Sequence, residues 1–187
     1  MDNSLYWIWY QLGVGVNSDV KAMLDFFDSP EGLYNASILE WAACSGFTAA
    51  KIDRLASVTL DDAQRVADEC DRNGWDIVTY GDSRYPEILK SIKRPPAVLY
   101  VDGDILCLKD RLSISIVGTR KASEYSLKAA KLLSEGIAQC GAVIVSGGAL
   151  GVDSAAHIGA MSSGGRTVVV LGCGLGTDYL RANESQT

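Results

Sequence analysis

The sequence contains little histidine and no paired cysteines, and both shortages limit its chemistry. The 187 residues include one histidine, and the five cysteines are widely spaced, without a Cys-x-x-Cys. Zinc sites need clustered thiolate and imidazole ligands, so no metal site is predicted. Scattered cysteines in odd number are typical of reduced thiols in a cytoplasmic protein, and cytoplasmic is the localisation that the composition favours.

Long hydrophobic runs are absent as well. No segment reaches the roughly 18 uninterrupted apolar residues that a membrane span requires. The N-terminus has no basic stretch followed by an apolar core, so the sequence predicts neither a secretory signal nor a membrane partner.

An excess of positive charge is also missing. The formal net charge is −6, which argues against a broad electrostatic grip on nucleic acid. The charge is uneven, because residues 1–70 carry eleven acids and four bases, whereas residues 113–187 carry five acids and six bases. A local basic strip in the C-terminal half therefore stays open.

The usual nucleotide-binding motifs do not occur. There is no Gly-x-x-x-x-Gly-Lys-Ser/Thr, which excludes a P-loop nucleotidase, and no Gly-x-Gly-x-x-Gly follows the first strand of the C-terminal half. Dinucleotide binding in its common mode is thus disfavoured, and no cofactor is predicted.

The periodicity of the sequence changes near residue 70 and predicts two domains. Residues 1–70 favour short helices, the last over 61–71 with Asn73-Gly74 as its stop signal. Residues 71–187 begin with expected strands over 75–80 and 97–101. From residue 113 strands alternate with helices, which implies right-handed crossovers and a parallel sheet in an α/β fold. The clearest elements are strands over 142–146 and 167–171 and helices over 123–140 and 152–162.

Residues 12–15 have the hydrophobic-Gly-hydrophobic-Gly form of a helix-hairpin-helix turn. In that motif the glycines let backbone amides approach a DNA phosphate. The alternative is a plain helical connector, with Trp7, Trp9 and Leu12 in the core. Four residues are too few to decide between the two interpretations.

Two glycine-containing turns end neighbouring strands of the predicted parallel sheet. Gly118, Thr119, Arg120 and Lys121 follow the first strand, and residues 146–153 follow the second. Backbone amides and helix N-termini at the carboxyl ends of parallel strands bind anions, and arginine adds a planar donor fork suited to phosphate. These turns predict a phosphate-binding site at one edge of the sheet. The alternative for the first turn is a structural loop with Arg120 solvated or paired to an acid.

The second turn contains Ser146, Gly147 and Gly148, with Asp153 as the expected N-cap or first-turn acid of the next helix. His157 lies one helical turn further on, on the same face as Asp153. No motif places a serine or cysteine nucleophile beside this pair, so local packing or hydrogen bonding of His157 is favoured over catalysis. Cys173 follows the third strand and has no evident basic partner that would lower its pKa.

Taken together, these residues resemble the DNA-processing protein A family, also called DprA or Smf. The similarity runs from about residue 5 to residue 183, and the order and spacing of five blocks make it specific. The blocks are residues 82–89, 95–103, 116–123, 146–157 and 164–167.

The resemblance implies a SAM-like or helix-hairpin-helix-like domain over residues 1–70, followed by a Rossmann-like domain over 71–187 whose C-terminal part is missing. It implies a non-enzymatic protein that binds and shields single-stranded DNA during natural transformation and helps to load a RecA-type recombinase, as a homodimer when full length. The implied DNA-phosphate contacts are Gly118, Thr119, Arg120, Ser146, Gly147 and Gly148, with Lys121 added by adjacency alone.

Three positions depart from the family pattern. Gly148 and Leu150 stand where the family usually has leucine and arginine, and losing that cation is expected to weaken or redirect phosphate binding. Tyr179-Leu180 stands where the family has Tyr-Pro. Tyr125 and Tyr179 are the aromatic residues nearest the turns, so base stacking is expected to be minor.

The alternative function is a nucleotide-binding or phosphoribohydrolase-like protein on the same scaffold. Such proteins carry a Pro-Gly-Gly-x-Gly-Thr turn and a catalytic glutamate. Residues 146–151 lack the proline and the threonine, and no glutamate occurs in the expected helix that follows them. A third interpretation is a purely interacting chain whose open sheet edge needs a partner.

Overall fold

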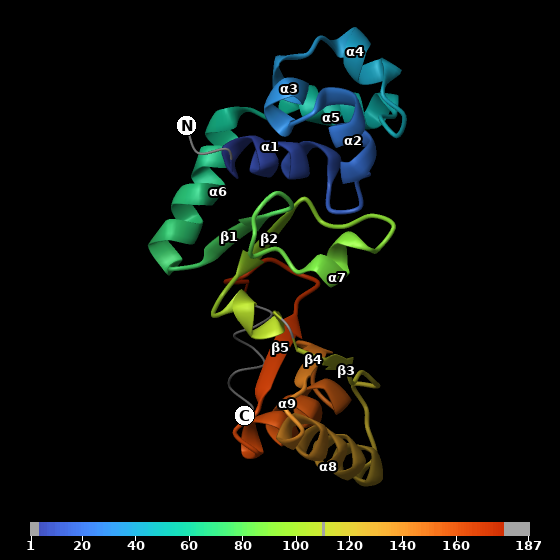
Figure 1. Ribbon diagram of the computed structural model, residues 1–187, viewed down its shortest axis with the longest axis vertical. Coiled ribbons are helices and arrows are strands. Elements are labelled where there is room, and N and C mark those ends of the chain that lie inside the picture. Colours follow the sequence, from blue (N-terminus) through green and yellow to red (C-terminus); the bar gives the residue numbers. More distant parts are fainter. Residues whose placement is uncertain (1–3, 110, 178–187) are drawn as a thin grey trace. The chain divides into compact units, whose positions relative to one another are not determined.

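The computed structural model describes residues 4–109 and 111–177, and the chain forms two compact units, Met1–Ile105 and Leu106–Thr187 (Figure 1). The expected domain boundary near residue 70 falls inside the first unit, because β1 (Asp76–Thr79) and β2 (Val98–Val101) belong to that unit. No helix of the described residues is long and apolar enough to span a bilayer.

The described residues before β1 form six helices, and a side-chain N-cap begins each of the last five. Thr59, for example, accepts a hydrogen bond from the amide of Asp62, whose carboxylate accepts one from the amide of Thr59. Such reciprocal caps satisfy the free amides of a first helical turn. The helices are α1 (Ser4–Val14), α2 (Val20–Phe27), α3 (Pro30–Asn35), α4 (Ile38–Ala43), α5 (Ala49–Ser57) and α6 (Leu60–Asn73).

Helix α1 forms the centre of the first unit. Trp7 and Trp9 are buried as predicted, and the Trp9 indole donates to the carbonyl of Val58 at 2.9 Å. The side-chain oxygen of Gln11 accepts a hydrogen bond from the amide of Val98 at 2.8 Å, which ties α1 to β2. A buried amide side chain paired in this way avoids the cost of an unsatisfied polar group.

The glycines of residues 12–15 serve packing. Gly13 lies inside α1, where a Cβ would overlap Leu55 of α5, and Gly15 has a φ of 81° just after the helix. Gly13 thus permits close packing of α1 on α5, and Gly15 permits the left-handed backbone after the helix.

Strands β1 and β2 pair antiparallel, with Asp76 opposite Val101. Between them lie a turn and the short helix α7 (Glu87–Lys90). Tyr85 is buried in this segment, and its hydroxyl donates to the carbonyl of Pro96 at 2.8 Å.

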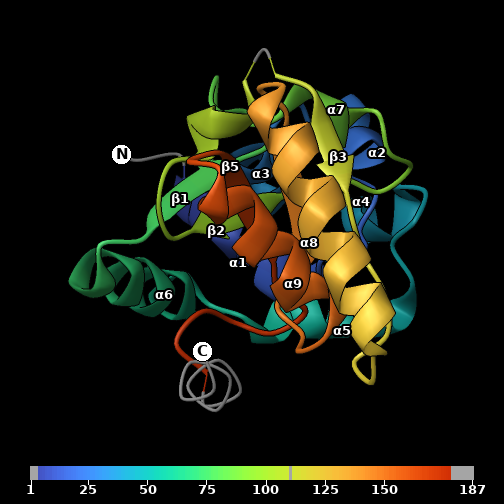
Figure 2. The ribbon, with the colours of Figure 1, turned by 90° about the horizontal axis from the view of Figure 1, so that it is seen from below.

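The second unit contains a three-stranded parallel sheet in the order β3-β4-β5. Right-handed crossovers between strands in this order place both connecting helices on one face, and Figure 2 shows α8 and α9 side by side. The elements are the 3₁₀ turn η1 (Ile105–Leu108), β3 (Ser113–Ser115), α8 (Glu124–Gln139), β4 (Val143–Gly147), α9 (Val152–Ser162) and β5 (Arg166–Val170).

Small residues bring α8 and α9 close together. A Cβ at Gly159 would overlap the carbonyl oxygen of Lys131, and Ser134 is fully buried between the helices. The core cluster between these helices and β4 contains Ala138, Ile144, Ala156 and Ala160. Short side chains bury little area, so this core is small.

Candidate anion-binding site

The two predicted turns lie together at the carboxyl edge of the parallel sheet. Strands β3 and β4 are hydrogen-bonded neighbours, with Ser113 opposite Val143. Beyond them, the amide of Val152 donates to the carbonyl of Thr119 at 3.3 Å and joins the first turn to the start of α9. This edge is where parallel α/β folds bind ligands.

The first turn presents its cations to solvent. Arg120 and Lys121 are exposed, and among the described residues neither side chain forms a hydrogen bond or an ion pair. The amides of Thr119 and Arg120 also have no acceptor within the described ranges, whereas the amide of Lys121 donates to the Thr119 hydroxyl at 3.2 Å. The turn therefore offers two amides and two cations to an anion.

The Ser146 hydroxyl already donates a hydrogen bond within the protein. Its side chain is buried, and Oγ donates to the carbonyl of Ile116 at 2.5 Å, which holds the ends of β3 and β4 together. Gly147 and Gly148 follow it and are half-buried. Any direct contact of Ser146 with a ligand would therefore have to replace this hydrogen bond.

The glycines make room for protein atoms. A Cβ at Gly118 would lie 2.7 Å from a methyl group of Val152, and one at Gly147 would lie 2.6 Å from Oδ2 of Asp153. Gly151 has a φ of 94°, which only glycine adopts readily, and a Cβ there would overlap the carbonyl of Thr119. These contacts fix the spacing of the two turns, a role different from the ligand approach that the sequence suggests.

Helix α9 connects both turns through two side chains. Its N-cap is Gly151, so the first-turn acid is Asp153, which is buried and accepts a hydrogen bond from the amide of Gly118 at 3.3 Å. One turn later, His157 Nε2 lies 2.9 Å from the carbonyl of Gly147, and Nδ1 lies 2.7 Å from the Thr167 hydroxyl. His157 thus bonds locally. Thr167 is a residue of this network that no sequence motif pointed to, although a threonine near the start of the apolar run of β5 is a detectable signal.

The remaining candidates lie around this edge. Cys173 follows β5, and its sulfur accepts a hydrogen bond from the Thr177 hydroxyl at 3.4 Å. Tyr125 is 81% exposed near the start of α8, and Leu150 is 38% exposed beside Gly151. Tyr179 and Leu180 lie outside the described residues.

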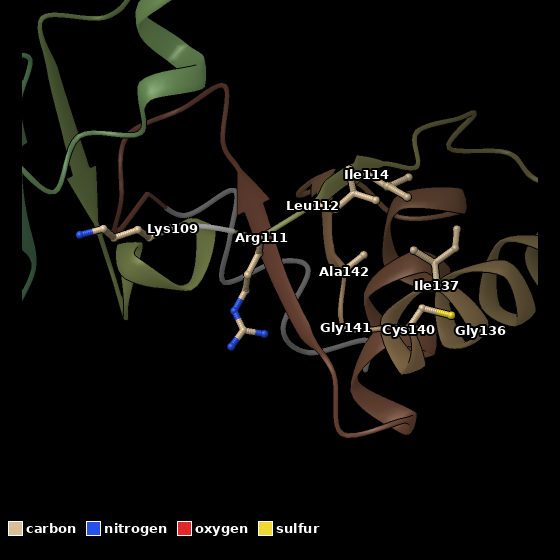
Figure 3. A pocket seen from close by; sticks show the side chains of 9 residues that line it. All are labelled: Lys109, Arg111, Leu112, Ile114, Gly136, Ile137, Cys140, Gly141 and Ala142. Atoms are coloured by element: carbon tan, nitrogen blue, oxygen red, sulfur yellow. The ribbon is translucent and has the colours of Figure 1, made fainter.

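A separate hollow of about 600 Å³ lies at the other end of the sheet (Figure 3). Leu112, Ile114 and Ala142 come from the amino ends of β3 and β4, and Ile137 and Cys140 come from the end of α8. Lys109 and Arg111 also line the hollow, but the helix end beside it is the C-terminus of α8, whereas anions favour helix N-termini. We therefore place the candidate site at the carboxyl edge.

Parallel strands and crossover helices on one face define an α/β protein of Rossmann-like class, and its carboxyl edge carries an exposed cationic turn. Residues 76–187 match the family model described as DNA recombination-mediator protein A, so the chain belongs to that family.

Curated relatives agree with this assignment. The chain is 38% identical over 110 residues to the DNA processing protein DprA of Bacillus subtilis, an alignment that covers 59% of this chain and 37% of the relative. It is 30% identical over 186 residues to the protein Smf of Synechocystis, covering 96% of this chain and 46% of the relative. The chain therefore spans less than half the length of these relatives.

Solved structures show the same fold. The X-ray structure of DprA from Streptococcus pneumoniae aligns with a TM-score of 0.74 and 24% identity, covering 100% of this chain and 63% of that one. DNA processing protein A from Helicobacter pylori aligns with a TM-score of 0.51 and 35% identity, covering 58% of this chain and 47% of that one. The latter structure concerns the single-stranded DNA binding mode of that protein.

Proposed function

We propose that this chain binds single-stranded DNA through its phosphate backbone at the carboxyl edge of the β3-β4-β5 sheet. The observation that carries the proposal is the exposed Arg120 guanidinium, which has no acid partner among the described residues and lies next to two amides without acceptors. Backbone binding of this kind is largely independent of base sequence and sensitive to salt. The proposed contacts are Gly118, Thr119, Arg120, Lys121, Gly147 and Gly148, with Ser146 holding the strand ends beneath them.

Membership of the family and the single-stranded DNA binding mode of the Helicobacter pylori relative support this choice of ligand. The proposal extends to the role that the family resemblance implies for the longer protein. In that role a cytoplasmic homodimer shields incoming single-stranded DNA and helps to load a RecA-type recombinase. The chemistry proposed for the edge is binding, with no covalent step.

The test compares two arginines of the same unit. Arg120 follows β3 at the proposed site, whereas the exposed Arg111 precedes β3 beside the hollow at the other edge (Figure 3). Arg120→Ala is expected to weaken binding of a fluorescein-labelled oligothymidine by about three- to tenfold at low salt. It should also lower the slope of log K against log salt concentration by about 0.7, the value for one lost phosphate contact on a single strand.

Arg111→Ala is the matched control and should leave affinity and salt slope at parent values. Equal effects of the two substitutions would show that binding depends on net charge alone and would contradict the site. Release of a free base from a nucleoside monophosphate by the parent protein would instead support the phosphoribohydrolase-like alternative.

A further inference from the structure

His157 is held on both sides of its ring by groups that belong to the proposed site. Nε2 lies 2.9 Å from the carbonyl of Gly147, and Nδ1 lies 2.7 Å from Oγ1 of Thr167. The same Oγ1 lies 3.0 Å from the carbonyl of Ile144 on β4. The imidazole thus connects the turn after β4 to a chain of two further hydrogen bonds.

Counting hydrogens shows that this chain of bonds depends on the charge of the ring. A carbonyl oxygen accepts only, so Nε2 must carry hydrogen to bond Gly147. In the neutral ring, Nδ1 must then accept the single hydroxyl hydrogen of Thr167, and no hydrogen remains for Ile144. In the imidazolium, Nδ1 donates to Thr167, whose hydroxyl donates to Ile144, and all three contacts are satisfied.

The ionisable groups on the described elements around the ring include Arg120 and Lys121, because the first turn is joined to the start of α9. Helix α9 contributes Asp153, one turn before His157, β5 contributes Arg166 beside Thr167, and β4 contributes none. Asp153 also contacts the first turn through the amide of Gly118. Helix α8 packs on α9. Its ionisable side chains are exposed or half-exposed, namely Glu124, Tyr125, Lys128, Lys131 and Glu135.

A phosphate seated on the amides that follow β4 would add negative charge next to the residue whose carbonyl the ring contacts. An anion there favours the imidazolium, and by reciprocity the imidazolium favours the anion. We propose that His157 is a positioning residue of the DNA site and that binding of single-stranded DNA is coupled to uptake of one proton on its imidazole. This inference rests on the proposed function, because the coupled ligand is the DNA phosphate.

Because the chain has a single histidine, protonation of its imidazole can be measured directly. His157 is the only histidine, so its ring resonances can be followed without assignment in an NMR titration of tag-free protein. The titration midpoint of the imidazole is expected to rise by half a pH unit or more, on the order of a shift caused by one nearby charge, when a saturating 5′-hydroxyl oligothymidine is added. An unchanged midpoint would overturn the coupling.

Binding measurements give a second readout. Affinity for the same oligothymidine, measured by fluorescence anisotropy at constant salt, should increase by about three- to tenfold from pH 8 to pH 6 in the parent. His157→Gln keeps an amide donor for the Gly147 carbonyl but cannot take up the proton, so its affinity should change little over this range. Thr167→Val removes the hydroxyl at nearly constant shape and should reduce the same pH dependence.

Ser162→Ala is the matched control, because it removes a hydroxyl that donates to the carbonyl of Ile158 at the exposed end of the same helix. It should keep the pH profile of the parent. A parent-like profile in His157→Gln, or a loss of affinity that is equal at every pH, would show a merely structural histidine. Binding that Arg120→Ala leaves unchanged would contradict the proposed site itself, so the two failures are distinguishable.

Discussion

At the scale of single residues, Arg84 is the centre of a hydrogen-bond network at the turn after β1. Its guanidinium donates to Asp76 at 3.0 Å, to Asp82 at 2.8 Å and to the carbonyl of Ile77 at 3.2 Å. The planar fork of arginine suits several acceptors at fixed angles, which lysine cannot match. The residues around the turn after β1 therefore hold that turn in place.

The Arg84→Ala variant should be less stable by about 1–2 kcal/mol, a value reduced from that of a buried charged hydrogen bond because the side chain is partly exposed. Hydrogen bonds from Arg84 are the main cause that lowers the pKa of Asp82. That contribution is complete above the ordinary pKa of an aspartate and is lost as the pH falls through the lowered value. Urea unfolding at pH 7 and pH 3 should therefore show a smaller acid-induced loss in the variant than in the parent.

Arg65→Ala provides the comparison, since Arg65 makes only an exposed ion pair with Asp62 on α6. Its unfolding midpoint at pH 7 should stay near that of the parent. If Arg84→Ala behaves in the same way, the network around Asp82 contributes nothing measurable.

The positions of the candidate site residues could be predicted from the sequence, but their roles could not. Strand-end position and residue type located Arg120 and Lys121 at the sheet edge, and the structure leaves both exposed. The sequence could not show that Gly118 and Gly147 face Val152 and Asp153, because a missing side chain can admit a ligand or a protein atom equally well.

At the scale of elements, the contact between α8 and α9 depends on one glycine. A Cβ at Gly159 would overlap the carbonyl oxygen of Lys131, whereas a Cβ at Gly136 on α8 would have no atom within 4 Å. Gly159→Ala is expected to destabilise the chain by about 1–3 kcal/mol through overpacking. Gly136→Ala should be neutral or stabilising by up to about 1 kcal/mol, because alanine favours helix.

Urea denaturation followed by far-UV circular dichroism compares the two variants directly. Similar midpoints for both glycine substitutions would mean that the helices can separate at no cost, contrary to the close packing seen here.

Element types were predictable because periodicity reports them directly. The expected helix over 123–140 corresponds to Glu124–Gln139, and that over 152–162 corresponds to Val152–Ser162. Pairing was harder, since β1 and β2 form an antiparallel pair in the first unit. Apolar strand runs of this length do not reveal which neighbour they pair with, because pairing depends on contacts distant in sequence.

At the scale of the whole molecule, the two units have very different cores. The first unit buries large side chains such as Trp9, Tyr10, Met23 and Leu55, whereas the core cluster of the second consists of Ala138, Ile144, Ala156 and Ala160. Hydrophobic stabilisation is roughly proportional to the apolar area removed from water, so the first unit gains far more of it. The described part of the second unit also leaves large apolar residues exposed, namely Leu112, Val117, Leu132, Leu133 and Val170.

These cores predict that the units differ when they are produced separately. Residues 1–105 should unfold in one cooperative urea transition, since their core is dense and three or more elements contact it. Residues 106–187 should show a shallow transition and bind the dye ANS, because apolar surface stays exposed. Circular dichroism and ANS fluorescence of both pieces, compared with the full chain, measure this difference. Two equally steep transitions would show that small side chains and close helix packing alone suffice to stabilise the unit that carries Arg120.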